Sequence, residues 1–244
     1  MPEIVFIGTG DAFGSGGRRQ TAILVRDRGH SLLLDCGPST LSGMKALGID
    51  PLEIDSIALS HFHGDHIGGV PFLLIDYQYQ RVRERPLQIF GPPGVGERLQ
   101  HLNRAFHYAP HEGREYELLY REFSPECGLE SGPFRLTPHP AHHHPETNPH
   151  MLRVECAARS LFFTGDTGWH EALPERVGDV DLLISECVFL EERFDFHMSA
   201  DRLDRERGRF RCRRTVLTHL GSEVLEALDR VRFDTVEDGS VIAL

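Results

Sequence analysis

Four potential metal ligands lie within six positions of the segment SHFHGDHIGG (60–69), namely His61, His63, Asp65 and His66. Imidazole nitrogens together with carboxylate oxygens suit zinc, manganese or iron. An ordinary solvated loop rarely collects four such side chains, here interrupted by Gly64 where a strand is expected to turn into a helix. The segment therefore predicts a metal site.

A loop with four ligands cannot complete two metal sites, so further ligands must come from elsewhere in the chain. The candidates are the histidines of HPAHHH (139–144), Asp166 in LFFTGDTGW and His219 in TVLTHLG. Taken alone, Asp166 is as readily a turn residue and His219 a capping histidine. Each follows an apolar segment, and this agreement strengthens the interpretation of each as a ligand.

These side chains must be positioned by the elements that precede them. Short apolar segments at 54–59, 161–164 and 215–217 are predicted strands, and in open α/β structures ligands collect beyond the carboxyl ends of strands. We expect other strands at 4–7, 21–25, 31–35, 87–90, 134–137, 152–156 and 182–186, and helices at 41–47, 68–83, 95–106, near Glu171, and at 199–207 and 222–230. This order indicates sheets covered by helices.

The length and composition of the chain indicate its domain organisation and its cellular environment. With 244 residues and 40% hydrophobic content, one domain spanning 1–244 is expected. Five scattered cysteines without a CxxC spacing argue against a disulfide framework and a thiolate zinc site, and favour a reducing cytoplasm. No signal peptide and no apolar run of about 20 residues is present, so we expect no membrane segment.

The order HxHxDH, a later histidine, GDT and a last histidine in THLG resembles the metallo-β-lactamase superfamily over nearly the whole chain. The opening FIGTGDAFGSGGRR followed by LLLDCGPST is similar to the ribonuclease Z branch of that superfamily. The resemblance implies an α/β fold, a four-layer αββα sandwich of the metallo-β-lactamase type.

The resemblance also implies two divalent metal ions, with zinc favoured and manganese or iron as alternatives. One ion would be held by two histidines of the first motif and one histidine of 142–144, for which we favour His143, and the other by Asp65, His66 and His219, with Asp166 as a bridge. The full implied ligand set is His61, His63, Asp65, His66, His143, Asp166 and His219. His139 and His150 are expected to be non-ligands.

Two further positions resemble ribonuclease Z, Glu186 in LLISECVF and His197 in FHMSA. The resemblance implies that they form an acid–base pair. It also implies that Asp65 both binds metal and orients the attacking group. Without the family pattern, a strand-end carboxylate and a loop histidine would be the simpler interpretation.

The implied function is a metal-dependent phosphodiesterase that uses a metal-bridging hydroxide as nucleophile. A lactonase or thioesterase on the same metals is the alternative. An inactive metal-binding homologue ranks last because all seven ligands are present.

The expected substrate is a small or medium phosphate ester or another ester. The net charge of −11 repels a polyanion, and no segment resembles the arm with which ribonuclease Z grips transfer RNA, so long RNA is not an expected partner. The stretch 201–214 carries seven arginines against three acidic residues, and either holds a substrate phosphate or forms an ordinary solvated face. For assembly, we consider a homodimer.

Overall fold

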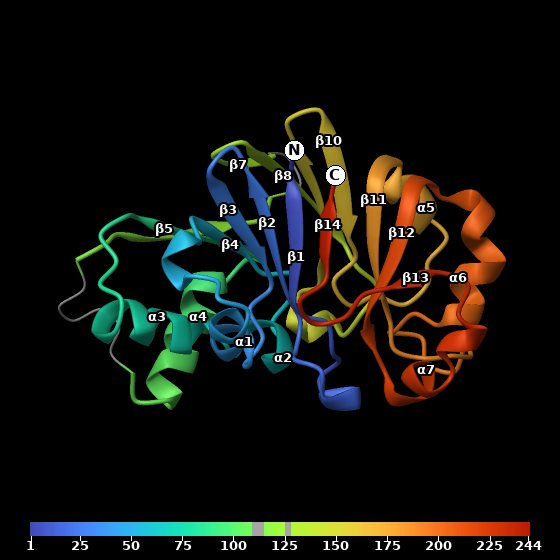
Figure 1. Cartoon of the computed structure of the whole chain (residues 1–244), viewed down its shortest axis with the longest axis horizontal. Coiled ribbons are helices and arrows are strands. Elements are labelled where there is room, and N and C mark those ends of the chain that lie inside the picture. Colours follow the sequence, from blue (N-terminus) through green and yellow to red (C-terminus); the bar gives the residue numbers. More distant parts are fainter. Residues whose placement is uncertain (109–114, 125–127) are drawn as a thin grey trace.

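Two seven-stranded sheets stack face to face, and helices cover the outer face of each sheet (Figure 1). The structure is a computed structural model that describes residues 1–108, 115–124 and 128–244. Helices α1 to α4 lie on one side of the molecule and α5 to α7 on the other. The predicted four-layer αββα sandwich is confirmed.

The first sheet contains the strands of the N-terminal half and the last strand of the chain. Its order is β14 (Val241–Ala243), β1 (Glu3–Gly8), β2 (Ala22–Asp27), β3 (His30–Leu34), β4 (Ser56–Ala58), β5 (Leu87–Gly91) and β6 (Leu118–Glu122). The strands from β3 to β6 run parallel to one another. The loop after β4 therefore opens at the carboxyl edge of this parallel part.

The second sheet contains the strands of the C-terminal half. Its order is β13 (Asp234–Thr235), β12 (Arg211–Leu220), β11 (Asp179–Cys187), β10 (Arg159–Phe163), β9 (His150–Cys156), β8 (Phe134–Pro140) and β7 (Leu129–Ser131). The strands from β10 to β13 run parallel. Their carboxyl ends consequently meet at one edge.

Alternation of apolar side chains along the strands produces three apolar layers. In β1, Ile4 and Phe6 enter the layer between the two sheets, whereas Val5 and Ile7 enter the layer beneath the N-terminal helices. Successive strand residues point to opposite faces, so a strand that is apolar at every position is buried on both. This explains why the central strands of both sheets are continuous apolar runs.

The helices pack on the outer faces through short apolar stripes. Met44, Leu73 and Leu99 belong to the first outer layer, and Leu173 and Leu203 to the second. The helices are α1 (Thr40–Ala46), α2 (Gly64–Ile67), α3 (Val70–Tyr79), α4 (Val95–Ala105), α5 (Leu173–Val177), α6 (Ala200–Glu206) and α7 (Ser222–Glu226).

The largest difference from the sequence-based prediction lies in β12, which begins at Arg211 rather than near position 215. Strand β12 pairs in parallel with β11, so that Asp179 lies opposite Arg211. The arginine-rich stretch is therefore part helix and part strand, because pairing with β11 extends it beyond its apolar residues. Strands β6, β7, β13 and β14 were not predicted, since strands of two to five residues at sheet edges carry little periodic signal.

Cys36, Cys156, Cys187 and Cys212 are free thiols, and the first three are buried. Cys127 lies outside the described residues. Across the described ranges, every helix is too short or too polar to cross a membrane.

The layer between the sheets provides a direct test of the fold. The Phe6 side chain is fully buried there, so Phe6→Ala is expected to lower the free energy of unfolding by about 3–5 kcal/mol. Val241→Ala, at a position 57% exposed on the edge strand β14, should change it by less than about 0.5 kcal/mol. Denaturant unfolding of both variants gives the comparison, and equal losses would contradict the layer assignment.

Candidate metal centre and active site

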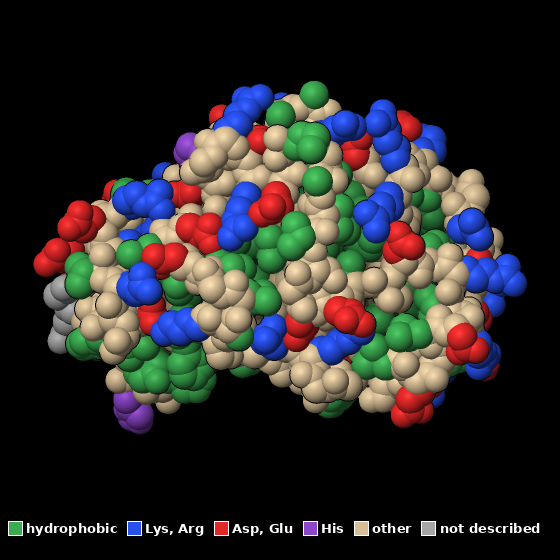
Figure 2. All heavy atoms as spheres, in the orientation of Figure 1, with side chains coloured by type: hydrophobic (Ala, Val, Ile, Leu, Met, Phe, Trp, Pro, Cys, Tyr) green, Lys and Arg blue, Asp and Glu red, His purple; other side chains and the backbone are tan. Residues whose placement is uncertain are grey.

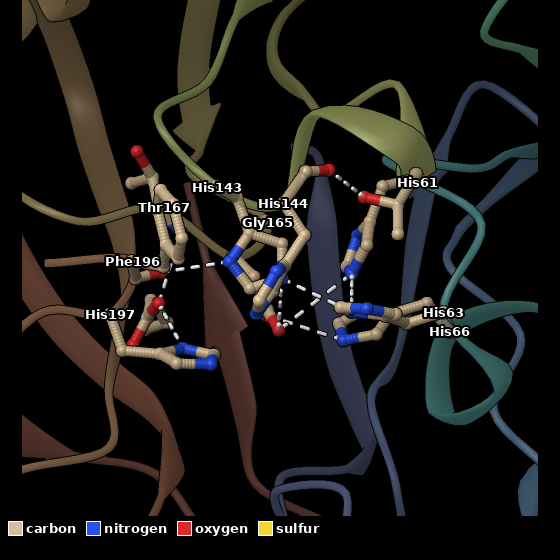
Figure 3. A network of polar contacts seen from close by, with 12 residues as sticks. His61, His63, His66, His143, His144, Gly165, Thr167, Phe196 and His197 are labelled. Carbon is tan, nitrogen blue, oxygen red and sulfur yellow. Dashed lines mark hydrogen bonds and ion pairs between the residues drawn. The ribbon is translucent and has the colours of Figure 1, made fainter. Parts of the chain in front are cut away.

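The predicted ligands from both halves of the chain meet at the ends of the two sheets. His61 and His63 lie in the loop after β4, and His143 lies in the loop after β8. Asp166 follows β10, and His219 lies near the end of β12. Figure 3 shows the imidazoles of His61, His63 and His143 turned toward one another. Parallel strands explain the convergence, since their carboxyl ends share an edge.

The first group of ligand atoms comes from three histidines and one carboxylate. His63 Nδ1 lies 3.1 Å from His61 Nε2 and 3.1 Å from His143 Nε2. Asp166 Oδ2 lies 3.8 Å from His61 Nε2 and 3.9 Å from His143 Nε2. Ligand nitrogens about 2.0–2.1 Å from a tetrahedral zinc would be separated by about 3.3 Å. The spacing of this group therefore fits one such ion.

The second group shares Asp166 with the first. Asp166 Oδ1 lies 3.2 Å from His66 Nε2 and 3.4 Å from His219 Nδ1. Asp65 Oδ2 lies 3.2 Å from the same His66 nitrogen and 3.5 Å from His219 Nε2. The two oxygens of Asp166 thus face different groups, which is the arrangement that a bridging carboxylate requires.

Several buried atoms in the cluster make no hydrogen bond of suitable geometry although carboxylates and imidazoles lie near one another, among them His66 Nε2, Asp166 Oδ1 and both ring nitrogens of His219. Buried polar atoms are normally hydrogen-bonded, so unpaired atoms concentrated in one place call for another partner. Imidazole nitrogens and carboxylate oxygens are ligands for a divalent cation, and in each group these atoms lie within 4.8 Å of one another. The residues present therefore fit divalent metal ions.

Neighbouring groups fix the tautomers of three of these histidines. Asp35, which is fully buried, accepts hydrogen bonds from His66 Nδ1 at 2.7 Å and from Ser60 Oγ at 2.8 Å. Ser60 Oγ in turn lies 2.9 Å from His61 Nδ1, and the Phe196 carbonyl oxygen lies 2.8 Å from His143 Nδ1. In each ring the other nitrogen is left to face the cluster, as metal-binding histidines require.

Asp35 was not predicted as a site residue. Its signal in the sequence is an apolar run that ends in a carboxylate, LLLDCG, which by itself looks like a strand end followed by a turn. Its backbone φ of 57° is unusual for a residue other than glycine. Such conformations concentrate at functional sites, where surrounding contacts hold them.

A local irregularity of β12 orients His219. The register with β11 shifts between Glu186 and Cys187, which lie opposite Thr218 and Leu220, so His219 is left out of the pairing. His219 has a φ of 54°, and its N–H donates to the Thr9 carbonyl oxygen at 2.9 Å. A bulge of this kind re-aims a side chain at the end of a strand.

Burial and neighbouring charges set the protonation of the cluster. Burial lowers the pKa of His61 well below its ordinary value, with a further contribution from His66, and burial lowers the pKa of His143 to about 4. Burial alone would lower the pKa of His66 as well, but the carboxylates of Asp166 and Asp65 raise it well above the ordinary value. His61 and His143 are thus neutral and ready to bind a cation, whereas cation binding at His66 releases a proton.

His197 and Glu186, for which an acid–base role was expected, lie within hydrogen-bond distance of each other. His197 Nδ1 lies 2.8 Å from Glu186 Oε1, and the buried Glu186 carboxylate also accepts hydrogen bonds from the Thr167 and Met198 amides. Burial alone would lower the pKa of His197, but the Glu186 carboxylate raises it to about 9. The imidazole therefore carries a proton near neutral pH.

The cluster opens into a cavity of about 230 Å³, the catalytic cavity, whose lining includes Asp11, Phe13, His63, His144, Val188 and His197. His143 belongs to the first ligand group, whereas His144 lies at the cavity wall with its Nδ1 3.5 Å from Glu146. His142, His139 and His150 belong to neither group.

The arginines of the stretch 201–214 all have carboxylate partners. Arg202 lies near Glu192 and Glu206, and Arg209 near Glu171. The remaining pairs join Arg205 to Asp201, Arg207 to Asp204, Arg211 to Asp179, Arg213 to Asp181 and Arg214 to Asp234. Basic and acidic side chains are accordingly interspersed on the face shown in Figure 2. This pairing favours a solvated face over a phosphate-holding surface.

The stacked sheets and the cluster at their ends define a metallo-β-lactamase fold, and the chain is similar to ribonuclease Z proteins. The chain belongs to the family described as Anti-Pycsar protein Apyc1, whose model matches residues 2–237. The predicted superfamily and branch are confirmed, and the family of the matching model was not predicted.

Among similar proteins, the ribonuclease Z of Methanothermobacter thermautotrophicus is 32% identical over 198 residues, which cover 77% of this chain and 63% of that protein. The human zinc phosphodiesterase ELAC protein 1 is 34% identical over 119 residues, which cover 45% of this chain and 33% of that protein. The chain thus matches less than two thirds of the length of either relative. The Bacillus subtilis metallo-β-lactamase fold protein YhfI superposes with a TM-score of 0.80 at 24% identity, covering 99% of this chain and 98% of that chain.

Asp35 is connected to both ligand groups. It accepts a hydrogen bond directly from His66 of the second group, and it is linked through Ser60 to His61 of the first. Asp35→Asn is therefore expected to weaken zinc binding about 10–100-fold, because it removes the charge that orients these rings. Competition with a chromophoric chelator measures the affinity. Asp76→Asn, at a carboxylate that is equally buried but paired with Lys45, is the control. Equal losses in the two variants would show that Asp35 acts only on stability.

Proposed function

We propose that this protein is a metal-dependent phosphodiesterase with two divalent ions bound by the seven residues of the two ligand groups. Zinc is the metal we favour. The observation that carries the proposal is the pair of ligand groups joined by Asp166, beside the hydrogen-bonded pair of Glu186 and His197. Relatives named ribonuclease Z and zinc phosphodiesterase support the reaction class. When bound, the two ions would supply an activated bridging hydroxide as nucleophile and neutralise charge on the phosphoryl oxygens.

The side chains around the ions have separable roles in this proposal. Asp65 binds metal and orients the attacking group, since its Oδ2 reaches both His66 and His219. His197 donates a proton to the leaving oxygen. Glu186 binds Nδ1 of His197, which leaves the other ring nitrogen available to the cavity that His197 lines.

The size and charge of the site support a small ester as substrate. The catalytic cavity of about 230 Å³ lies below the roughly 300–1,000 Å³ of typical ligand pockets. The net charge of −11 and the paired arginines offer little to a long RNA.

The direct test is hydrolysis by the metal-loaded protein of bis(p-nitrophenyl) phosphate beside a lactone and a thioester. The phosphodiester should be hydrolysed with the highest kcat/KM of the three. Preferred turnover of the lactone or the thioester would overturn the phosphodiesterase assignment and support the alternative hydrolase.

The bridging role predicts a large effect of one substitution on metal content. Asp166→Ala should reduce the bound metal from two ions per chain to one or none and abolish nearly all activity, because both groups lose a ligand. His150→Ala should leave the metal content unchanged, since His150 lies outside both groups and its Nδ1 bonds to the Asn148 carbonyl. Elemental analysis of the purified variants measures the number of metal ions per chain. Equal metal contents in the two variants would refute the bridging role of Asp166.

The proposed acid–base pair predicts a loss of activity without a loss of metal. His197→Ala should lower phosphodiester turnover about 10²–10⁴-fold while both metals stay bound, because a proton donor is lost but no ligand. The loss should shrink for esters of acidic phenols, whose oxygens depart without a proton. Rates measured across a series of leaving groups give the test. A uniform loss would indicate substrate positioning, and a full rate on every ester would remove His197 from the mechanism.

A further inference from the structure

His219 is held differently from three other histidines of the metal centre. His61, His66 and His143 each have one ring nitrogen paired with a residue outside the ligand groups. Both ring nitrogens of His219 are buried, and in the described part of the chain neither makes a hydrogen bond. They face carboxylates of its co-ligands at 3.4 and 3.5 Å. The direction of the His219 ring therefore depends on the conformation of its backbone.

One backbone hydrogen bond supports that conformation. His219 has a φ of 54°, which is strained for a residue other than glycine, and it is left out of the pairing between β12 and β11. Its N–H donates instead to the carbonyl oxygen of Thr9 at 2.9 Å. Thr9 follows β1 directly and is fully buried. A displacement of Thr9 would therefore move His219 as well.

Asp238 fixes the position of Thr9. Oδ1 of Asp238 accepts hydrogen bonds from the Thr9 amide at 2.9 Å and from Thr9 Oγ1 at 2.8 Å. Oδ2 accepts from the Arg19 amide at 2.9 Å and lies 3.5 Å from Arg19 Nη1. Hydrogen bonds to a carboxylate are stronger than those between neutral groups. Thr9 is thus bound to Asp238 through its amide and hydroxyl, and to His219 through its carbonyl.

Asp238 lies in the middle of a segment that joins the two sheets. This crossing segment, residues 236–240, runs from β13 to β14 (Figure 1). The Val236 amide donates to a carbonyl oxygen of β12, and the Gly239 amide donates to a carbonyl oxygen of β1. The segment is therefore attached to both sheets on either side of Asp238, which gives the carboxylate a fixed position from which to hold Thr9.

We propose that Asp238 is a positioning residue for the second metal ion, and that it acts through Thr9 on the backbone of His219. None of its described contacts is to a metal ligand, so its effect is confined to the ion that His219 binds. The inference rests on the proposed two-metal function and deepens it by assigning the affinity for one of the two ions to a residue of the crossing segment.

Titration of the metal-free protein with zinc in the presence of a chromophoric chelator tests the inference, because it measures two dissociation constants without measuring activity. His219→Ala identifies the constant that belongs to the second ion. Asp238→Ala should weaken binding of that ion about 10-fold, the low end of the range for residues that support a metal ligand, and change binding of the first ion less than about twofold. Asp238→Asn should retain most of the affinity, since its Oδ1 still accepts from Thr9.

Asp55→Ala is the matched control. The side chains of Asp55 and Asp238 are both 18% exposed, and Asp55 likewise accepts from one backbone amide, that of Ser31, and from an arginine, Arg85. Asp55 precedes β4, whereas the metal ligands follow that strand. Its replacement should leave both dissociation constants unchanged.

Thr9→Val provides a second test that does not remove the carboxylate. It nearly keeps the size of the buried side chain but removes the hydroxyl that donates to Asp238. It should weaken binding of the second ion by a smaller factor than Asp238→Ala and leave the first ion unchanged. If Asp238→Ala does not fold, Thr9→Val decides alone.

Two outcomes would overturn the inference. The affinity for the second ion could be unchanged in both Asp238→Ala and Thr9→Val. Alternatively, the variants could weaken binding of both ions equally, which would indicate a general loss of structure. If the wild-type protein binds fewer than two zinc ions, the proposed function itself fails, and this inference fails with it.

Discussion

A carboxylate removed from water must be matched by positive charge, and the Asp166 carboxylate is almost fully buried. Its two oxygens face four imidazoles that arrive from different loops and strands. Burial raises the pKa of Asp166, but the charges of His66 and His219 hold it well below its ordinary value. The architecture around the site supplies this compensation, because both sheets end at the same place and each contributes ligands.

The supporting contacts follow from that requirement. Asp35 and Ser60 orient rings from the first sheet, the Phe196 carbonyl orients His143, and the Thr9 carbonyl holds the backbone of His219 in its unusual conformation. The contacts of Asp35, Phe196 and Thr9 each join a ligand to a residue remote in sequence, whereas Ser60 is the neighbour of His61 and links it to Asp35. Preorganisation of the cluster thus depends on contacts within each half of the chain and, through Thr9 and His219, on the packing of the two halves together.

The family resemblance implied the four-layer sandwich and the choice of His143. Apolar strands that end in histidine or aspartate carry a local signal, which pointed to the other six members of the two ligand groups. The sequence could not reveal Asp35, whose role depends on its distance from His66, thirty-one positions away. It also could not reveal the bulge at His219 or the start of β12 at Arg211, since both arise from pairing with β11. The choice of His143 among three adjacent histidines relied on family resemblance, and a neighbouring backbone carbonyl is what orients that ring in the structure.

The central claim is that one buried carboxylate joins two metal ions. Anomalous diffraction at the zinc absorption edge, from crystals of the zinc-loaded protein, tests it most directly. The account predicts two peaks, one beside His61, His63 and His143 and one beside Asp65, His66 and His219, with an oxygen of Asp166 against each. A single peak, or two peaks of which one lies away from Asp166, would contradict it.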